Sequence, residues 1–505
     1  MAPAFHAIER GLDRCFGVAA NPLRQLGAVA YWLFWAAIAS GVYVYAYYET
    51  GVAASYASVE RLSSSPRALS GLMRSLHRYA SDGLVLTVAL HVLREFTYGR
   101  YKGFRWFTWT TGVPLVALAL VSGIVGYWLV WDMLAQFVSI AAAEALGALP
   151  GLGDTLVRNF IAPEAVTDRF FSLLAFVHIG VSLLLLLGMW IHVQRVSRAR
   201  VKPDAALGWG LLATLIALAL VWPAASQAEA DLTRAPFALA LDWLYLFPFP
   251  LADVMPPALL WAGACAATLA LCALPWLTRT HRAPAAVVHP DECNGCGQCE
   301  ADCPYGAVIV TPEQPGGPPR AQVIAALCAG CGICVGACPS ATPFRSTPML
   351  GSGIELPQLP VNALRTRLEH ALGGANGSVV VLVGCERGAR VGALADPAVT
   401  AMSLPCIGML PPAFIDYALK RGAAGVMIAG CAAGDCEFRL GGEWLAARVA
   451  GGRQPRVRLA HDRRHRLRIV ETGPSDAAAL MQELTAFRAV LRRPTTSFQP
   501  GGARA

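Results

Sequence analysis

Two apolar segments each carry a pair of histidines fourteen residues apart, and this repeated spacing constrains the fold more than any other feature of the sequence. The first segment holds His77 and His91, and the second holds His178 and His192. Fourteen residues are close to four turns of an α-helix, so both imidazoles of a segment point to one side, about 21 Å apart at about 1.5 Å per residue. Two such helices facing each other would form two bis-histidine sites, one above the other.

Imidazole is a common iron ligand, and an ionisable side chain within a membrane span indicates a functional site. A single histidine could instead be a hydrogen-bonded packing residue, but two pairs at one spacing favour ligands. Glycines repeat the same interval on two other apolar segments. Lone glycines usually serve helix packing, whereas matched pairs predict helix walls against which a porphyrin can lie. These pairs are Gly27 with Gly41 and Gly112 with Gly126.

Four motifs around these residues resemble the cytochrome b subunit of cytochrome bc complexes: RSLH, HVLREFTYGRY, GYWLVWD and RFFSLLAFVH. The resemblance covers residues 1 to about 275 and implies two non-covalent b-type haems. It assigns His77 and His178 to the haem near the positive side of the membrane, and His91 and His192 to the haem near the negative side. It also implies that Arg74 and Arg94 face haem propionates.

The composition agrees with a membrane protein that has soluble parts, since 55% of the 505 residues are hydrophobic and 15% are charged. The net charge of +8 sits largely beside apolar segments, and no motif for a nucleic-acid partner is present. Six segments are long enough to span a bilayer. They are residues 25–48, 76–97, 111–131, 170–193, 205–223 and 255–277.

The charges between these segments predict their orientation. The N-terminus, the second and fourth connections and the exit from the sixth span are basic, whereas the loops at 144–169 and 225–254 lean acidic. By the positive-inside rule the chain is a multi-pass protein of the cytoplasmic (inner) membrane, with everything after residue 280 in the cytoplasm. The first 17 residues are expected to form an amphipathic surface helix.

Two aspartates are candidates for proton transfer at quinone sites. TRAPFALALDWLYLFPFPL resembles the Pro-Glu-Trp-Tyr region of the family's quinol-oxidising site, with Asp242 in place of the glutamate. Quinol oxidation needs a proton acceptor there; an ordinary interfacial aspartate is the alternative. Asp204 resembles the carboxylate of the quinone-reducing site, although Ser197 replaces a quinone-contacting histidine. Gln25 stands where some relatives carry a haem-tethering cysteine, so no covalent haem is expected.

Twelve of the fifteen cysteines lie between residues 293 and 436, at short intervals that favour metal ligation in a reducing compartment. The first eight form two Cys-x-x-Cys-x-x-Cys-x-x-x-Cys-Pro runs, as in bacterial two-cluster ferredoxins, where the fourth cysteine of each run ligates the other cluster. A zinc site has no use for the repeated Cys-Pro. One 4Fe-4S cluster is therefore assigned to Cys293, Cys296, Cys299 and Cys338, and the other to Cys328, Cys331, Cys334 and Cys303.

The last four cysteines, Cys385, Cys406, Cys431 and Cys436, lie in a region of α/β character. GSVVVLVGC and GVMIAGC predict buried strands that end at cysteines, where such sheets bind ligands, and PPAFIDYALKRGA predicts a helix between them. The stretch from LPCIGML to FRLGG resembles the delta subunit of methyl-viologen-reducing hydrogenases. That resemblance implies a 2Fe-2S cluster and docking on a heterodisulfide-reductase-like flavoprotein, with structural or redox-sensing thiols as the alternative. The family commonly has a second cysteine in its first motif, where this chain has Glu386 after Cys385.

The expected fold class is multi-domain. Residues 1–280 form an all-α cytochrome b bundle of six spans, and residues 281–345 form a small α+β dicluster ferredoxin domain. Residues 346–375 are expected to be a linker, and residues 376–505 an α/β domain that resembles the hydrogenase delta subunit.

In this order the parts predict an electron-transfer subunit of a quinone-linked oxidoreductase, joining the quinone pool to a soluble flavoprotein. The membrane field favours outward electron movement by roughly 2.3 kcal/mol per 100 mV, so flow from a cytoplasmic donor to quinone is preferred. One alternative is a quinol dehydrogenase that feeds a cytoplasmic reductase or bifurcating complex. Another is a membrane anchor without quinone chemistry. Cytochrome b relatives are dimers, which favours a homodimer here.

Overall fold

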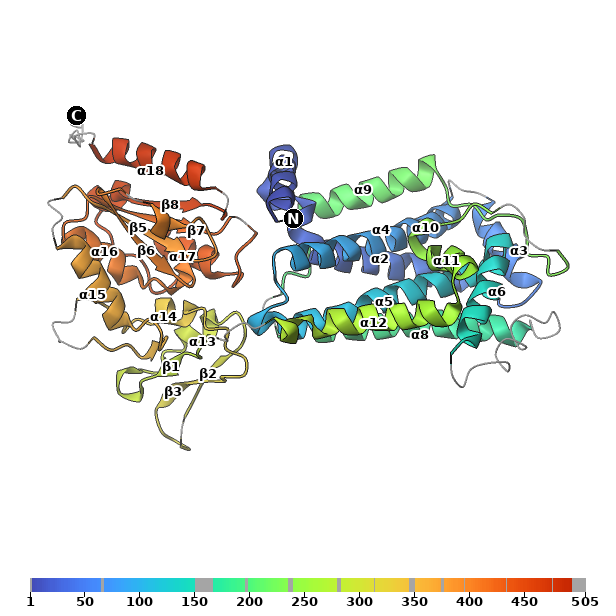
Figure 1. Ribbon diagram of the computed structural model, residues 1–505, viewed down its shortest axis with the longest axis horizontal. Helices are drawn as coiled ribbons and strands as arrows, with labels where there is room; N and C mark the ends of the chain where they lie inside the picture. Colours follow the sequence, from blue (N-terminus) through green and yellow to red (C-terminus); the bar gives the residue numbers. More distant parts are fainter. Residues whose placement is uncertain are drawn as a thin grey trace, which may run out of the picture. The chain divides into compact units, whose positions relative to one another are not determined.

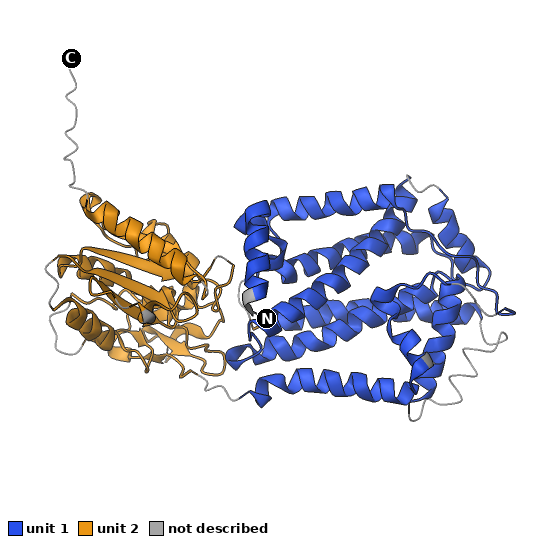
Figure 2. Cartoon of the chain, turned by 45° about the horizontal axis from the view of Figure 1, so that its top comes forward, with its two compact units in different colours: residues 1–194, 199–281 blue, residues 195–198, 282–505 orange. Residues whose placement is uncertain are grey.

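The chain folds into two compact units, one made of residues 1–194 and 199–281 and the other of residues 195–198 and 282–505 (Figure 2). Ser197 and parts of the two acidic loops at 144–169 and 225–254 lie outside the described residues. The structure is a computed structural model that describes residues 2–64, 68–149, 167–195, 199–234, 239–278, 283–312, 314–344, 350–373, 377–394, 396–432, 434–474 and 476–492.

The centre of the first unit is a bundle of four long helices (Figure 1). Helix α2 packs along α4, and α5 packs along α8. Their apolar contacts form one core, which includes Leu33 and Phe34 of α2 and Phe171 of α8. The bounds of these helices are Leu26–Tyr47 for α2, Leu69–Thr97 for α4, Trp106–Trp128 for α5 and Asp168–Val193 for α8.

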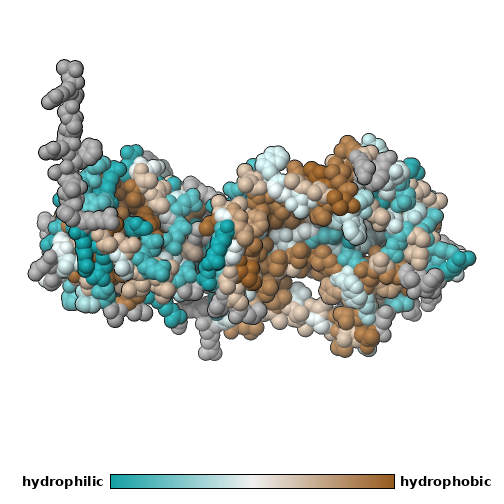
Figure 3. Space-filling view, turned by 90° about the horizontal axis from the view of Figure 1, so that it is seen from above, coloured by the Kyte–Doolittle hydropathy of each residue, from teal (hydrophilic) through white to brown (hydrophobic). Residues whose placement is uncertain are grey.

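Two further helices flank this bundle, α9 (Ala205–Val221) against α4 and α12 (Pro257–Leu277) against α5. Hydrophobic side chains are exposed on the surface of the unit (Figure 3), as a helix in lipid requires. The shorter helices of this unit are α1 (Ala2–Ala20), α3 (Ala54–Ser63), α6 (Met133–Gly147), α10 (Trp243–Leu246) and α11 (Pro248–Val254), with 3-10 turns η1 (Pro22–Gln25) and η2 (Gly103–Arg105).

Four helical segments in the described part of the chain are long and apolar enough to cross a membrane, whereas six spans were expected. Helix α4 is long enough, with 29 residues, but it carries several charged side chains. Helix α9 is apolar but has only 17 residues. The four segments are Pro22–Tyr47, Gly103–Trp128, Asp168–Val193 and Pro257–Leu277.

The first half of the second unit contains two short helices and a hairpin. Strands β2 (Val308–Pro312) and β3 (Pro319–Val323) pair antiparallel. Helices α13 (Gln298–Asp302) and α14 (Ile333–Ala337) each begin after a glycine with a left-handed backbone, at φ 75° for Gly297 and φ 74° for Gly332. An L side chain is disfavoured at such a φ, so glycine is required where the chain turns into each helix. A 3-10 turn, η3, covers Pro290–Glu292.

The segment at 346–375, expected to be a linker, is instead folded over its described residues 350–373. Strand β4 (Ile354–Glu355) pairs with β1 (Val287–Val288), and helix α15 (Val361–Leu372) follows. The prolines and glycines that suggested a linker flank this helix and do not interrupt it. One face of α15 is buried through Val361, Leu364, Leu368 and Leu372, which is the spacing of an amphipathic helix.

The rest of the unit is a parallel four-stranded sheet in the order β6-β5-β7-β8. Strands β5 (Val380–Cys385) and β7 (Gly425–Gly430) lie where strands were expected, whereas β6 (Val399–Leu404) and β8 (Leu467–Glu471) were not anticipated. The expected helix is α16 (Pro412–Lys420). The remaining elements are α17 (Gly441–Val449), α18 (Ala477–Arg492) and the 3-10 turns η4 (Val391–Ala393), η5 (Ile407–Met409) and η6 (His461–Arg466).

Helices cover both faces of this sheet, which explains why its central strands are uniformly apolar (Figure 1). Alternate residues of β5 belong to different cores. Val381 and Val383 pack in a cluster with residues of α15 and α16, whereas Val380 and Leu382 pack with residues of α18. The first of these clusters also includes Val308 of the hairpin, so the half that contains the two cysteine runs and the half that contains the sheet share one core.

Candidate functional site

The four histidines lie at two levels of the helical bundle, two on α4 and two on α8. At one level His77 and His178 face each other, with ring centroids 6.1 Å apart and ring planes at 72°. A metal bound by two imidazoles at about 2 Å each needs ring centres about 6 Å apart. This pair therefore has the separation that a bis-histidine iron site requires. At the other level His91 lies close enough to His192 for an electrostatic interaction.

Hydrogen bonds from the second ring nitrogen orient the first pair. Nδ1 of His77 lies 2.8 Å from the carbonyl oxygen of Ala37, and Nδ1 of His178 lies 2.8 Å from that of Ser122. A carbonyl only accepts hydrogen bonds, so Nδ1 carries the proton and the lone pair of Nε2 is left for a ligand. Metal-bound histidines are usually held in this way.

Each of the four glycines singled out from the sequence lies opposite a different histidine. A Cβ atom added to Gly41 would lie 2.8 Å from Cε1 of His77, and one added to Gly112 would lie 2.8 Å from Cε1 of His192. Any side chain at these two positions would therefore displace an imidazole. The other pairs are Gly126 with His178, at 3.2 Å, and Gly27 with His91, at 3.6 Å.

The two arginines expected near propionates lie toward opposite ends of α4. The guanidinium of Arg94 donates to Glu9 Oε1 through Nε at 2.7 Å, and the Tyr98 hydroxyl donates to Glu9 Oε2 at 2.7 Å. Burial opposes ionisation of Glu9, but His6 and Arg94 beside it lower its pKa to about 2. Arg94 thus holds α1 against α4. Arg74 donates to Ser226 Oγ at 2.7 Å.

Asp242 is the centre of a charged network next to the bundle. Its Oδ1 accepts a hydrogen bond from the backbone N–H of Leu244 at 2.8 Å and so caps α10. Its Oδ2 accepts from the Arg78 guanidinium and the Tyr127 hydroxyl. Arg78 Nε also lies 3.3 Å from Asp82 Oδ2. One guanidinium therefore bridges two carboxylates.

Arg78, Asp82 and Tyr127 were missed in the sequence. The signal was present, because Arg78 and Asp82 are opposite charges four residues apart on one face of a largely apolar helix, where ionisable groups usually have a function. The second expected carboxylate, Asp204, caps α9 by accepting from the Ala206 N–H at 3.0 Å. Its own N–H donates to Gln25 Oε1 at 2.7 Å.

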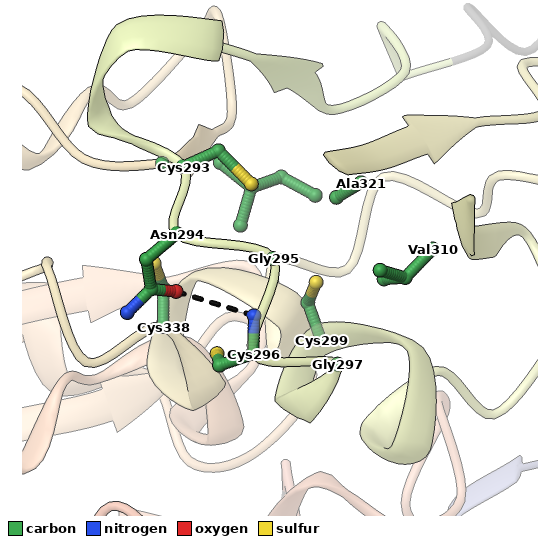
Figure 4. Close-up of a pocket in the computed structure, with 11 residues that line it drawn as sticks. Cys293, Asn294, Gly295, Cys296, Gly297, Cys299, Val310, Ala321 and Cys338 are labelled. Atoms are coloured by element: carbon green, nitrogen blue, oxygen red, sulfur yellow. Dashed lines mark hydrogen bonds between the residues drawn. The ribbon is translucent and has the colours of Figure 1, made fainter. Parts of the chain in front are cut away.

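In the second unit, four cysteines from two distant runs line one cavity (Figure 4). Three belong to the first run and the fourth to the end of the second run, which is the grouping that the spacing predicts. The Asn294 side chain turns the loop by accepting from the Cys296 N–H at 3.2 Å. Burial raises the pKa of the Cys299 thiol to about 12. The four thiols are Cys293, Cys296, Cys299 and Cys338.

The complementary four thiols also converge, since Cys334 interacts electrostatically with Cys331, Cys328 and Cys303. Backbone amides point at their sulfurs: the N–H of Ala307 donates to Cys303 Sγ at 3.2 Å. Burial raises the pKa of Cys331 to about 12 and raises the pKa of Cys334 well above its usual value. Thiols crowded in this way, several of them buried, cannot ionise together without a cation, so both sets fit iron binding.

The last four cysteines meet at the carboxyl edge of the parallel sheet. Cys385 ends β5 and Cys431 follows β7, and their Sγ atoms lie 3.3 Å apart. The chain leaves the middle strand β5 for β6 on one side and β7 lies on the other, so these thiols lie at the switch point where such sheets bind ligands. Cys406 precedes η5, and Cys436 hydrogen-bonds with the thiols of Cys406 and Cys431.

The backbone packs closely around these thiols. A Cβ atom added to Gly441 would lie 2.1 Å from Cys406 Sγ, so only glycine allows α17 to start there. Hydrogen bonds from Cys406 and Cys431 hold the pKa of Cys436 well below its usual value, while the pKa of Cys406 is raised well above it by its bond to Cys436 and by burial. Despite the departure at Glu386, four thiols converge, and a multinuclear iron site fits them.

Comparison with known proteins matches three parts of the chain to family models. Residues 18–220 match "Cytochrome b/b6/petB", residues 292–342 match "4Fe-4S dicluster domain", and residues 376–493 match "Methyl-viologen-reducing hydrogenase, delta subunit".

Individual relatives match part of the chain. Cytochrome b6 of Synechococcus sp. (strain CC9605) is 33% identical over 156 residues, which are 30% of this chain and 71% of that protein. Cytochrome b6 of Chlamydomonas reinhardtii is 31% identical over 156 residues, covering 30% of this chain and 72% of its own length. A solved chain titled "Hyperthermophilic respiratory Complex III" aligns with a TM-score of 0.42 at 20% identity, covering 50% of this chain and 75% of that one.

Proposed function

The chain belongs to the cytochrome b family, and we propose that it transfers electrons between the membrane quinone pool and a soluble redox partner. It also contains a 4Fe-4S dicluster domain and a domain related to a hydrogenase delta subunit, so it combines the parts of a membrane electron-transfer protein. The observation that carries the proposal is the convergence of all twelve clustered cysteines into three sets of four within one compact unit. Haems and clusters, when bound, carry single electrons while the protein spaces them.

The chain's own residues hold these groups. His77 with His178 and His91 with His192 are the proposed axial ligands of two b haems, with Arg74 and Arg94 near the propionates. The first two cysteine sets hold 4Fe-4S clusters, and the set at the sheet edge holds a 2Fe-2S cluster. Helices α4 and α9 are the two additional proposed membrane spans. Helix α4 is long enough to cross a bilayer, and its charged side chain Arg78 has a partner within the protein, Asp242. Helix α9 is apolar over its 17 residues. The positive-inside rule places the iron–sulfur domains in the cytoplasm.

Asp242 is the proposed proton-exchange residue at the quinone site on the positive side. Quinone takes up two electrons and two protons to become quinol, so a side chain must donate protons in that direction and accept them in reverse. Arg78 and Tyr127 orient the Asp242 carboxylate. Asp82 provides a second proton position on the same guanidinium, because its Oδ1 is buried and has no hydrogen-bond partner among the described residues. Asp204 is the proposed counterpart at a quinone site on the negative side.

The favoured direction runs from a cytoplasmic donor to quinone, because the membrane field assists outward movement of electrons. The proposed donor is a flavoprotein similar to heterodisulfide reductase, bound through the C-terminal domain, which is related to a hydrogenase subunit. Cytochrome b relatives support a homodimer.

Anaerobic reduction of the purified protein by a short-chain quinol tests the proposal. The b-haem absorption band and the paramagnetic resonance signals of the clusters are followed together, with dithionite as the reference for full reduction. Reduction of the haems alone supports the favoured direction. Reduction of haems and clusters supports a quinol dehydrogenase that feeds a cytoplasmic reductase. If quinol reduces neither while dithionite reduces both, the quinone proposal fails and the protein is a membrane anchor for a redox complex.

A further inference from the structure

Arg448 on α17 is a fully buried cation, with 0% of its surface exposed. Its Nη2 pairs with the carboxylate of Asp302 on α13. Arg453 pairs with the same carboxylate, donating from Nε to Oδ1 at 2.8 Å, but 25% of the Arg453 side chain is exposed. Two guanidinium groups thus share one carboxylate, and this group of three residues keeps one net positive charge.

The hydrogen bonds of Arg448 are incomplete. Nη1 is buried and has no hydrogen-bond partner within the described parts of the chain. A buried charged donor without an acceptor is unfavourable, so this donor calls for an acceptor that the described protein atoms do not supply. An ion pair that only joined α13 to α17 would need neither the unpartnered Nη1 of Arg448 nor a net positive charge, since Arg453 already neutralises Asp302.

The surroundings of Arg448 suggest what that acceptor is. Helix α17 packs on η5, which begins next to Cys406, and the first residue of α17 touches the Cys406 sulfur. Arg448 interacts electrostatically with Cys406. On its other side Asp302 directly precedes Cys303, the thiol expected to reach the second 4Fe-4S cluster. Arg448 therefore interacts with residues at or next to two proposed iron–sulfur sites.

We propose that Arg448 is a positioning residue that sets the reduction potential of the 2Fe-2S cluster at Cys406. The inference rests on the proposed cluster at the four sheet-edge thiols. One-electron reduction converts one ferric ion of the cluster to ferrous and adds one negative charge, with no bond made or broken. A desolvated positive charge beside the cluster stabilises the reduced state more than the oxidised state, because charge and hydrogen bonds at the sulfurs control such potentials. Arg448 thereby raises the potential.

The experiment is an anaerobic redox titration of the full-length protein in detergent, with mediators, followed by electron paramagnetic resonance of each cluster. Arg448→Gln is expected to lower the ratio of reduced to oxidised 2Fe-2S cluster about tenfold at the wild-type midpoint, which is about 59 mV for one electron. Arg448→Lys keeps the positive charge and should therefore change this ratio less than Arg448→Gln does. Asp302→Asn removes the counter-charge and should shift the ratio the opposite way. Arg453→Gln, the matched control on the same carboxylate, should have a smaller effect because water screens its charge.

Different outcomes would overturn the proposed 2Fe-2S cluster and the proposed role of Arg448. A wild-type protein without a 2Fe-2S signal and with the iron of only two 4Fe-4S clusters overturns the proposed cofactor. A normal 2Fe-2S signal whose midpoint is the same in Arg448→Gln, Asp302→Asn and wild type overturns the role of Arg448. If Arg448→Gln fails to assemble, the role of the charge is decided by the midpoints of Asp302→Asn and Arg453→Gln, which should shift in opposite directions. A purely structural defect would not depend on the sign of the charge that is removed.

Discussion

The guanidinium of Arg78 on α4 binds the carboxylate of Asp242, which lies 164 residues further along the chain at the start of α10. This contact joins the helix that carries His77 to the loop expected to line a quinone site. It also leaves Asp82 on the other side of the same guanidinium. The proton chemistry proposed for Asp242 therefore depends on a partner that lies one residue from a proposed haem ligand.

Replacing Asp242 tests this chemistry directly. Asp242→Asn keeps the shape but removes the titratable group, so we expect quinol-dependent haem reduction to slow by about a hundredfold, at the lower end of general acid–base effects. Stopped-flow absorption of the b haems measures the rate. The control is Asp231→Asn, an exposed aspartate that pairs with Arg234 in the same loop region. Equal rates in wild type and Asp242→Asn would favour the membrane-anchor alternative.

The glycine opposite His77 should be essential for one haem. Gly41→Val places a side chain where even a Cβ atom would lie 2.8 Å from the imidazole. We expect the haem content per chain to fall from about two to about one, because only one of the two bis-histidine sites is disturbed. Pyridine haemochrome analysis measures the content. Gly180→Val on α8 is the matched control, since a Cβ atom there meets nothing within 4 Å. A full haem complement in Gly41→Val would contradict the site.

The cysteine pair at the sheet edge should hold iron. Cys431→Ser removes a thiol that lies 3.3 Å from Cys385 Sγ, and we expect loss of the 2Fe-2S signal together with about two iron atoms per chain. Both 4Fe-4S signals should remain. Iron analysis and paramagnetic resonance make the measurement, with the exposed Cys265→Ser as control. An unchanged iron content in Cys431→Ser would assign these thiols a structural or redox-sensing role.

The docking of α1 should depend on acid pH through Glu9. Its pKa falls from 4.5 to about 2 in the folded protein, so the folded state binds this proton less well than the unfolded state. The stabilisation is complete above pH 4.5 and is lost as the pH falls toward 2. Hydrogen exchange of α1 should accelerate across that window.

Glu9→Gln provides the control for this pH effect. It breaks a buried ion pair with Arg94 and should loosen α1 by about 3 kcal/mol at neutral pH. Exchange in Glu9→Gln should then be independent of pH in the same window after correction for the intrinsic rate. A variant that keeps the wild-type pH profile would assign the effect to another group.

Features that depend on local spacing were predictable from the order of the amino acids alone. Histidines fourteen residues apart indicate ligands on one helix face, and two cysteine runs indicate dicluster binding, because both patterns follow from helix geometry and ligand count. Strands β5 and β7 were predictable because strands covered on both faces are continuously apolar. Helix α15 was not predicted, because the prolines and glycines on both sides of it are typical of a linker although its own apolar residues have helical spacing.

The contacts between residues far apart in the chain are evident only in the folded protein. It brings each glycine to a particular histidine, Arg78 to Asp242, and Arg448 between Asp302 and Cys406. It also gathers four cysteines from three strand ends into one cluster. These relationships depend on how helices and strands pack, and two of them join residues more than a hundred positions apart. No local spacing encodes that packing.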